Sequence, residues 1–329
     1  MDVTCDIFSS LEPFANKLSS GGTMTAGPAH GSSAITLASL VSRERNILFI
    51  TAHGEDADEA FAMLEDIGTN VALFPALEFD IATELVASRL ALLEKLGRGD
   101  FQGVVVASIT SIMQMSPAIG AINSIVKILN PQMCCDLSAL QQWLVEAGYE
   151  RRESLEDSGQ FATRGGILDI ATASGEFVRL DFLGDTIETI HEVDPVSLGS
   201  DRVIDEVVLT STSRGACTAT IIEYLSGDWI SMLDDVEEVA RQSRSYIDRV
   251  EDTSEIAHYD DIQSSLSKTL YGMVGFCAPP AVAVDVELPL SSIPLFDISA
   301  SKALVELNNL AQTHRVTLAC RTSGEADRM

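Results

Sequence analysis

Basic residues are scarce in this chain. Its 329 residues include 21 Lys plus Arg against 49 Asp plus Glu, which gives a formal net charge of −28. Affinity for a phosphate backbone comes mainly from cations that displace counterions. The composition therefore argues against direct binding to duplex DNA. The acidity itself favours solubility or a salt-adapted host over a specific basic partner.

Long apolar runs and paired cysteine spacings are also missing. No apolar run approaches the roughly 20 residues of a membrane-spanning helix, and the start, MDVTCDIFSS, lacks the regions of a signal peptide. The six cysteines show no C-x-x-C or zinc spacing, and the five histidines no metal spacing. We expect a soluble cytoplasmic protein with buried free thiols, no membrane partner and no metal site. Without a nucleophile-elbow motif, no catalytic residue is expected either.

The chain is too long for one ordinary domain, and its first part has the pattern of a parallel sheet. Short β-branched runs at 46–52, 71–76 and 103–109 predict buried strands. Amphipathic stretches at 56–67 and 84–96 predict helices between them. Strand and helix in alternation indicate an α/β fold with right-handed crossovers.

A different pattern follows a predicted helix at 137–147. From Phe177 to Leu183 apolar and polar residues alternate, a turn follows at 184–185, and residues 186–193 return as a partner strand. One face of this hairpin is apolar, and the other carries Arg179. Upstream, Arg164 directly precedes two glycines, where the backbone can turn or approach a neighbour closely.

Residues 26–33, AGPAHGSS, stand where a nucleotide-binding loop G-x-x-x-x-G-K-[ST] would fall. Gly31 and Ser33 fit the motif, and Ala26 replaces its first glycine. Ser32 replaces the lysine that reaches the β and γ phosphates, so no ammonium offsets their charge.

The partner motif of such a loop is also eroded. Residues 230–235, ISMLDD, resemble an apolar strand that ends in an acidic pair. Asp234 could hold magnesium, but Asp235 stands where a catalytic glutamate is usual. Three interpretations stay open: an ordinary glycine-containing loop, a nucleotide site that has lost its function, and an active hydrolase with an unusual phosphate loop.

Several segments together resemble one family. Residues 159–195 read GQFATRGGILDIATASGEFVRLDFLGDTIETIHEVDP, and they follow LFPALE at 73–78, SRLALLEKL at 88–96, VVVASITSIM at 104–113 and LVEAGYE at 144–150. These motifs resemble the amino-terminal, UvrB-like module of the bacterial transcription-repair coupling factor (Mfd) family, and the excision subunit UvrB carries a looser version. The resemblance is strong to about residue 206 and weak beyond it.

The resemblance implies a parallel-sheet, helicase-like α/β domain without a working nucleotide site, interrupted by a small inserted α+β domain. We expect the first domain at 1–116 and 212–329, with elements at 221–225, 229–233 and 315–320 returning to its sheet, and the insert at 117–211. The region 252–298 is the hardest to interpret, and its pattern suggests that it includes a long ordered loop. The segment 79–86 offers Phe79 but no tyrosines, so a lesion-reading hairpin of the UvrB type is not expected.

In this family the intact protein is an ATP-dependent DNA translocase that displaces stalled RNA polymerase and recruits the repair protein UvrA through the inserted domain. The resemblance places the UvrA contacts at Arg164, Arg179 and Leu183, where the family has phenylalanine at the last position. An intradomain salt bridge is the alternative role of the two arginines.

For this chain the resemblance implies no cofactor, because the motor of the intact protein uses the ATP and magnesium. RNA polymerase and DNA would be met only through other domains, and the remainder of the coupling factor is a further expected partner. No motor domain fits within the 329 residues, so we expect a truncated module. A free-standing acidic interaction protein is the alternative.

Overall fold

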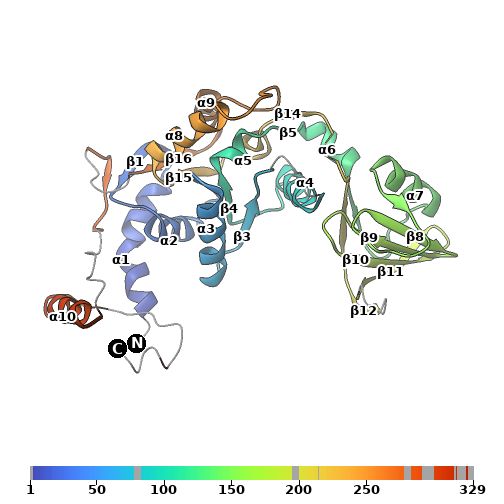
Figure 1. Ribbon diagram of the computed structural model, residues 1–329, viewed down its shortest axis with the longest axis horizontal. Helices are drawn as coiled ribbons and strands as arrows, with labels where there is room; N and C mark the ends of the chain where they lie inside the picture. Colours follow the sequence, from blue (N-terminus) through green and yellow to red (C-terminus); the bar gives the residue numbers. More distant parts are fainter. Residues whose placement is uncertain are drawn as a thin grey trace.

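The computed structural model describes residues 3–77, 83–194, 200–213, 215–277, 283–290 and 300–314, together with residues 316 and 324. An α/β body forms one end of the molecule and a smaller sheet with one helix forms the other (Figure 1). The expected strand at 315–320 and the Phe79 segment lie largely outside the described residues. Among the described helices, none is long and apolar enough to cross a membrane.

The larger body is built on a sheet in which every described strand pairs in parallel with its neighbours. In spatial order the strands are β17 (Val286–Glu287), β1 (Gly22–Gly27), β16 (Gly272–Phe276), β15 (Ile230–Leu233), β2 (Ile47–Thr51), β4 (Val104–Ser108) and β3 (Val71–Phe74). This sheet confirms the expected α/β class.

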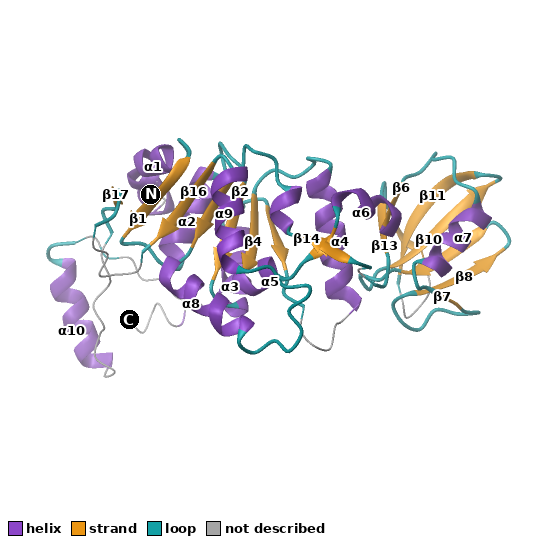
Figure 2. Cartoon of the chain, turned by 90° about the horizontal axis from the view of Figure 1, so that it is seen from above, coloured by secondary structure: helices purple, strands orange, loops and turns teal. Residues whose placement is uncertain are grey.

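Helices cover both faces of this sheet (Figures 1 and 2). One layer comprises α1 (Val3–Leu18), α2 (Ser32–Val41) and α3 (Gly54–Asp66), and the other α4 (Thr83–Gly97), α5 (Ile109–Met113), α8 (Val236–Ile247), α9 (Tyr259–Thr269) and the 3₁₀ helix η1 (Ile221–Tyr224). In β2, Ile47 and Phe49 join the first core, whereas Leu48 and Ile50 join the second. Burial on both faces explains why the central strands are uniformly apolar.

The structure corrects the sequence interpretation in two places. β16, which separates β1 from β15, lies in the stretch from 252 to 298, for which the sequence predicted no strand. Its glycines weaken the strand pattern, yet close packing requires Gly272, because a Cβ there would lie 3.0 Å from Gly21 Cα. Residues 221–224 do belong to the first body, but as η1 and not as a strand of its sheet.

The smaller sheet has the order β12-β11-β10-β9-β8-β7. Its strands are β7 (Glu150–Arg151), β8 (Gln160–Arg164), β9 (Ile167–Ala171), β10 (Phe177–Leu183), β11 (Thr186–Val193) and β12 (Ser200–Val203). β7 and β8 run parallel, and the other pairs are antiparallel. α7 (Leu137–Glu146) packs on one face, so the predicted helix and hairpin are both confirmed.

Two short antiparallel ladders connect the bodies. β5 (Ser116–Pro117) pairs with β14 (Cys217–Ala219), and β6 (Val126–Leu129) pairs with β13 (Val207–Thr210), with α6 (Ile119–Ile125) lying between β5 and β6 along the chain. The outgoing and returning segments therefore run side by side, as an inserted domain requires. We call these two ladders the stem. α4 packs against both stem strands β6 and β13.

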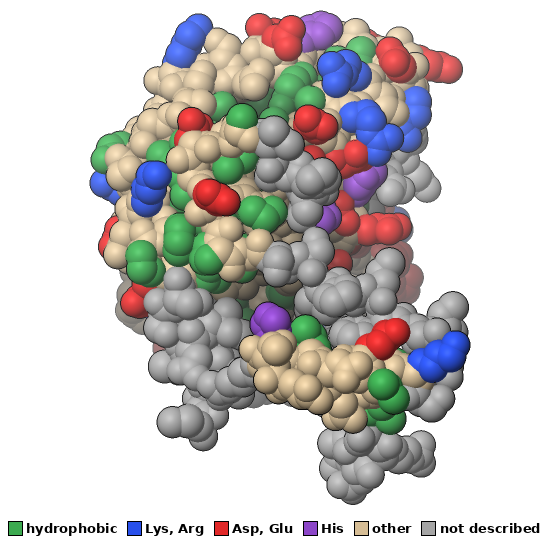
Figure 3. Space-filling view, turned by 90° about the vertical axis from the view of Figure 1, so that its left-hand side faces the viewer, with side chains coloured by type: hydrophobic (Ala, Val, Ile, Leu, Met, Phe, Trp, Pro, Cys, Tyr) green, Lys and Arg blue, Asp and Glu red, His purple; other side chains and the backbone are tan. Residues whose placement is uncertain are grey.

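The helix α10 (Ala300–Ala311) lies apart from the sheets (Figures 1 and 2). Figure 3 shows this end of the molecule, where acidic side chains are scattered over the visible surface. The cysteines in the described part that are free thiols are Cys134, Cys135, Cys217 and Cys277, but only Cys217 among them is buried, contrary to the expectation that all are.

Candidate functional site

Within the part of the chain that the structure describes, α7 covers one face of the smaller sheet and no helix covers the other. Val178 and Leu180 of β10 point to the α7 side and are buried, and Arg179 between them points to the other. The strand register places Arg179 opposite Asp169 and His191, and Ile167 opposite both Arg164 and Asp181. We call this second surface the open face. The period-two prediction for β10 is confirmed.

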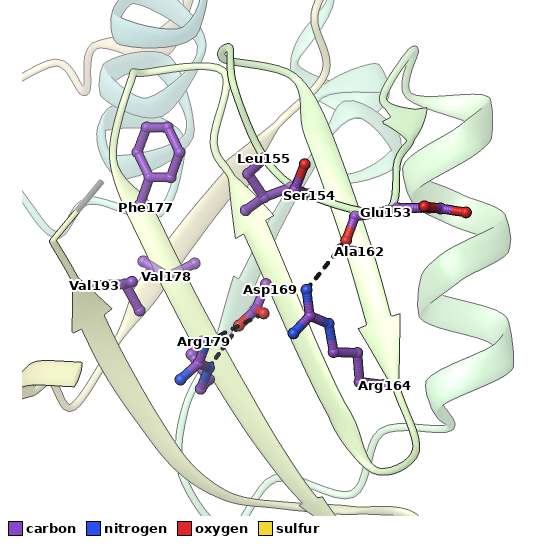
Figure 4. Close-up of a pocket in the computed structure, with 10 residues that line it drawn as sticks. All are labelled: Glu153, Ser154, Leu155, Ala162, Arg164, Asp169, Phe177, Val178, Arg179 and Val193. Carbon is purple, nitrogen blue, oxygen red and sulfur yellow. Dashed lines mark hydrogen bonds and ion pairs between the residues drawn. The ribbon is translucent and has the colours of Figure 1, made fainter. Parts of the chain in front are cut away.

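Arg179 is held in place by its own sheet. Its Nε donates to Asp169 Oδ1 at 2.6 Å and its Nη2 to Asp169 Oδ2 at 3.2 Å (Figure 4). This hydrogen bonding, with the nearby negative charges of Asp169 and Asp181, raises the pKa of Arg179 although partial burial opposes the shift. The intradomain salt bridge weighed from the sequence is therefore present. The side chain still keeps 25% of its surface exposed.

Arg164 ends β8 at the rim of the same face. Its Nη2 donates to the backbone oxygen of Glu153 at 3.3 Å, and within the described residues it has no carboxylate partner. The two glycines that follow Arg164 are required for different reasons. Gly165 has a φ of +64°, and a Cβ on Gly166 would lie 2.9 Å from Phe182 O. The double glycine thus lets the β8–β9 turn pass close to the end of β10.

Apolar side chains accompany the arginines. Leu183, at the end of β10, is 71% exposed. Ile167, the first residue of β9, is 38% exposed and lies in register between Arg164 and Asp181. The sequence interpretation missed Ile167, although the alternation in β9, where Leu168 and Ile170 face the core, could have identified it.

A shallow hollow of about 20 Å³ opens between Arg164 and Arg179. Figure 4 shows Leu155 and Ser154 of the preceding loop above β8 and β9, with Phe177 on the neighbouring strand β10. The hollow thus combines apolar walls with the two guanidinium groups. Such a surface offers another protein apolar contact area beside guanidinium groups, which form strong hydrogen bonds with carboxylates.

The degenerate phosphate loop connects β1 to α2, as a nucleotide loop would. Ala26 is fully buried at the end of β1, and Ser32, the first residue of α2, is exposed. The hydroxyl of Ser33 donates back to His30 O at 2.9 Å. Neither serine supplies the positive charge that polyphosphate binding requires.

Asp234 of the acidic motif contacts this loop directly. Gly31 N donates to both oxygens of the Asp234 carboxylate, at 3.1 and 3.2 Å, and His30 Nδ1 lies 3.3 Å from Asp234 Oδ1. Burial raises the pKa of Asp234, while His30 and the Gly31 N–H oppose that shift. A helix amino terminus is a natural anion site. The chain therefore places its own carboxylate where a phosphate oxygen would bind.

Asp235 has a different task. It adopts a left-handed backbone conformation, with φ +58°, and its side chain accepts the Glu238 N–H at 3.2 Å as the N-cap of α8. The structure thus brings Asp234 to the loop and assigns Asp235 to helix capping. Among the described residues, no cluster of histidine, cysteine and carboxylate side chains could hold a metal ion.

Comparison with known proteins places the smaller sheet in a family. Residues 128–214 match the model of the UvrB interaction domain. This range begins in β6 and ends beyond β13, so it comprises the six-stranded sheet and its α7 layer.

A longer part of the chain, beyond this domain, is similar to transcription-repair-coupling factors. That of Mycobacterium tuberculosis is 31% identical over 209 residues, which cover 59% of this chain and 16% of the relative. That of Bacillus subtilis is 28% identical over 211 residues, covering 60% and 17%, and that of Myxococcus xanthus is 31% identical over 125 residues, covering 38% and 10%. The chain matches only a small part of the length of these relatives. The matched domain, the related sequences and the parallel sheet with its insert support the identification of this chain as the amino-terminal, UvrB-like module of the transcription-repair-coupling factor (Mfd) family.

Proposed function

We propose that this chain acts in transcription-coupled nucleotide excision repair as a protein-binding module that captures UvrA on the open face. One observation carries the proposal: the region that matches the UvrB interaction domain presents Arg164, Arg179 and Leu183 around one accessible surface. Arginine ringed by apolar side chains is a typical composition of binding hot spots.

The two arginines contribute in different ways. Arg179 is already oriented by Asp169, so little side-chain entropy is lost when a partner approaches it. Among the described residues, Arg164 hydrogen-bonds only to a backbone oxygen, so its charge is available to an acidic group of the partner. Leu183 and Ile167 supply apolar area beside them.

We propose further that this chain does not hydrolyse nucleotides. Asp234 fills the anion position of the phosphate loop, and Ser32 supplies no cation. The ATP and magnesium chemistry, the DNA translocation and the displacement of RNA polymerase then belong to other parts of the intact family protein. This module would recruit the repair protein UvrA.

The test is calorimetric titration of the chain with UvrA from the same organism. Arg164→Ala and Leu183→Ala should each weaken binding by about tenfold, because each removes an exposed contact. Arg249→Ala is the matched control, since Arg249 is an exposed arginine of the other body that donates only to Ser245 O. All three variants should unfold at the parent temperature.

Arg179 needs a gentler substitution than charge reversal. A glutamate at 179 would face Asp169, so lost binding could reflect a disturbed sheet. Arg179→Gln removes the charge, and Asp169→Asn removes the ion pair while keeping the arginine. If the parent chain does not bind UvrA, or if Arg164→Ala, Arg179→Gln and Leu183→Ala all bind as the parent does, the proposed function is wrong.

A further inference from the structure

A second hollow lies beside the pocket of the open face. It is formed by Arg151, Arg152, Glu153, Ser154, Thr163 and Arg164. Three of these residues, Glu153, Ser154 and Arg164, also line the first hollow, so the two are continuous. The second hollow lies between the end of β8 and the edge strand β7, whose Arg151 is not among the UvrA contacts expected from the sequence.

The hollow carries positive charge that the chain leaves uncompensated. Arg152 pairs with Glu150. Arg151 has no hydrogen-bonding or ionic side-chain partner among the described residues, and Arg164 donates only to a backbone oxygen. Carboxylates outnumber cations 49 to 21 in this sequence, so a cation is more easily paired than left free. Two arginines that line one hollow, neither of them paired with a carboxylate among the described residues, therefore stand out.

We propose that this hollow, with Arg151 and Arg164 as its anchors, receives an acidic segment of the protein that the open face captures. The partner's carboxylates would accept hydrogen bonds from the two guanidinium groups, a geometry that suits Arg particularly well. This inference rests on the proposed function and adds to it both the chemistry of the partner segment and the residue Arg151.

Charge favours a short protein segment over a nucleic acid. A nucleic acid continues beyond any contact site, so its phosphates would also meet the field of a chain with a net charge of −28. A few carboxylates confined to the hollow avoid that repulsion. Glu153 at the rim and Glu150 beside Arg152 further restrict where a phosphate backbone could run.

The test compares Arg151→Glu with Arg249→Glu, which changes the net charge equally in the other body. UvrA binding is measured for both variants and the parent at low and high salt. We expect Arg151→Glu to bind about tenfold more weakly than the parent at low salt, with the gap narrowing at high salt because a local charge contact is screened. Arg249→Glu should bind as the parent does.

The outcomes separate the two claims. No binding by the parent would contradict the proposed function itself. Parent binding that Arg151→Glu leaves unchanged, or that both variants reduce equally, would overturn the acidic-segment proposal alone. A direct titration of the chain with a short duplex DNA completes the test: binding that Arg151→Glu abolishes would assign the hollow to nucleic acid and overturn the proposal. Both variants should unfold at the same temperature as the parent, because Arg151 and Arg249 are exposed.

Discussion

The backbone N–H of Gly31 donates to both carboxylate oxygens of Asp234, at 3.1 and 3.2 Å, and Asp234 directly follows strand β15, more than 200 residues later in the chain. The loop between β1 and α2 is therefore closed by an internal anion. This contact determines how the loop responds to substitution.

Restoring the missing lysine should not restore nucleotide binding. In Ser32→Lys the new ammonium would lie near Asp234 and pair with it, so ATP would still have to displace a carboxylate. We expect calorimetry with magnesium and ATP to show no measurable binding for the parent or for Ser32→Lys. The double variant Ser32→Lys, Asp234→Asn should bind ATP more tightly than the parent or the single variant Ser32→Lys. Micromolar binding by the parent would instead revive the hydrolase alternative.

Asp234 should make stability depend on pH. Burial raises its pKa, so the folded chain holds this proton more tightly than the unfolded chain does. The stabilisation from that proton is present at low pH and is lost as pH rises through the raised pKa. Asp234→Asn carries no charge, so its free energy of unfolding should increase relative to that of the parent as the pH rises above about 4, the ordinary pKa of aspartate.

Urea unfolding of the parent and Asp234→Asn, at several pH values from about 4 upward, measures the difference in their free energies of unfolding. Asp58→Asn is the control, since Asp58 lies exposed on α3. A difference between parent and Asp234→Asn that stays constant, or that moves in the opposite direction, would contradict the assigned effect of burial.

Tyr149 should be a major source of stability for the smaller body. Its buried hydroxyl donates to Thr210 O at 2.9 Å and accepts from Ala173 N at 3.0 Å, so it joins the stem to the end of β9. Burial raises the pKa of Tyr149 to about 12, which keeps the hydroxyl protonated at neutral pH. Tyr149→Phe leaves both backbone groups unsatisfied and should cost about 2 to 4 kcal/mol.

Denaturant unfolding checks this value, with Tyr271→Phe as the control. Tyr271 is 40% exposed, and its hydroxyl has no hydrogen bond among the described residues. An effect of Tyr149→Phe no larger than that of the control would show that water satisfies the two backbone groups.

Leu183→Phe should strengthen the capture of UvrA. A larger apolar side chain at this exposed position can bury more area against a partner, worth about 1 kcal/mol or roughly fivefold in affinity. The free energy of unfolding should change by less than about 0.5 kcal/mol, because the site is on the surface. Val145→Phe is the control: Val145 is 58% exposed on α7, which covers the opposite face. Equal binding by parent and Leu183→Phe would exclude this position from the contact.

Periodicity identified the elements with strong patterns. The centre of strand β10 alternates between buried apolar and polar residues, so the sequence predicts which side Arg179 occupies. The buried runs at β2 and β4 predict the parallel sheet. β16 escaped prediction because its two glycines are required by close neighbours and erase the apolar signal. Local sequence carries no record of such tertiary constraints.

The candidate site, too, could be predicted only in part from the sequence. The resemblance supplied Arg164, Arg179 and Leu183, whose role as UvrA contacts stays a prediction. The Arg179–Asp169 ion pair was foreseen only as an alternative, because its partner lies on another strand. The contact between Gly31 and Asp234 depends on the spatial order of β1, β16 and β15, which the sequence does not reveal.

The stem has a mechanical consequence. Both of its segments leave the larger body and enter the smaller one side by side. Tension that pulls the two bodies apart is therefore divided between two covalent strands loaded in the same direction. Such a load does not slide one strand past the other, so it need not break the ladder hydrogen bonds between them. A partner held on the open face could thus be dragged by the larger body without unravelling the domain that holds it.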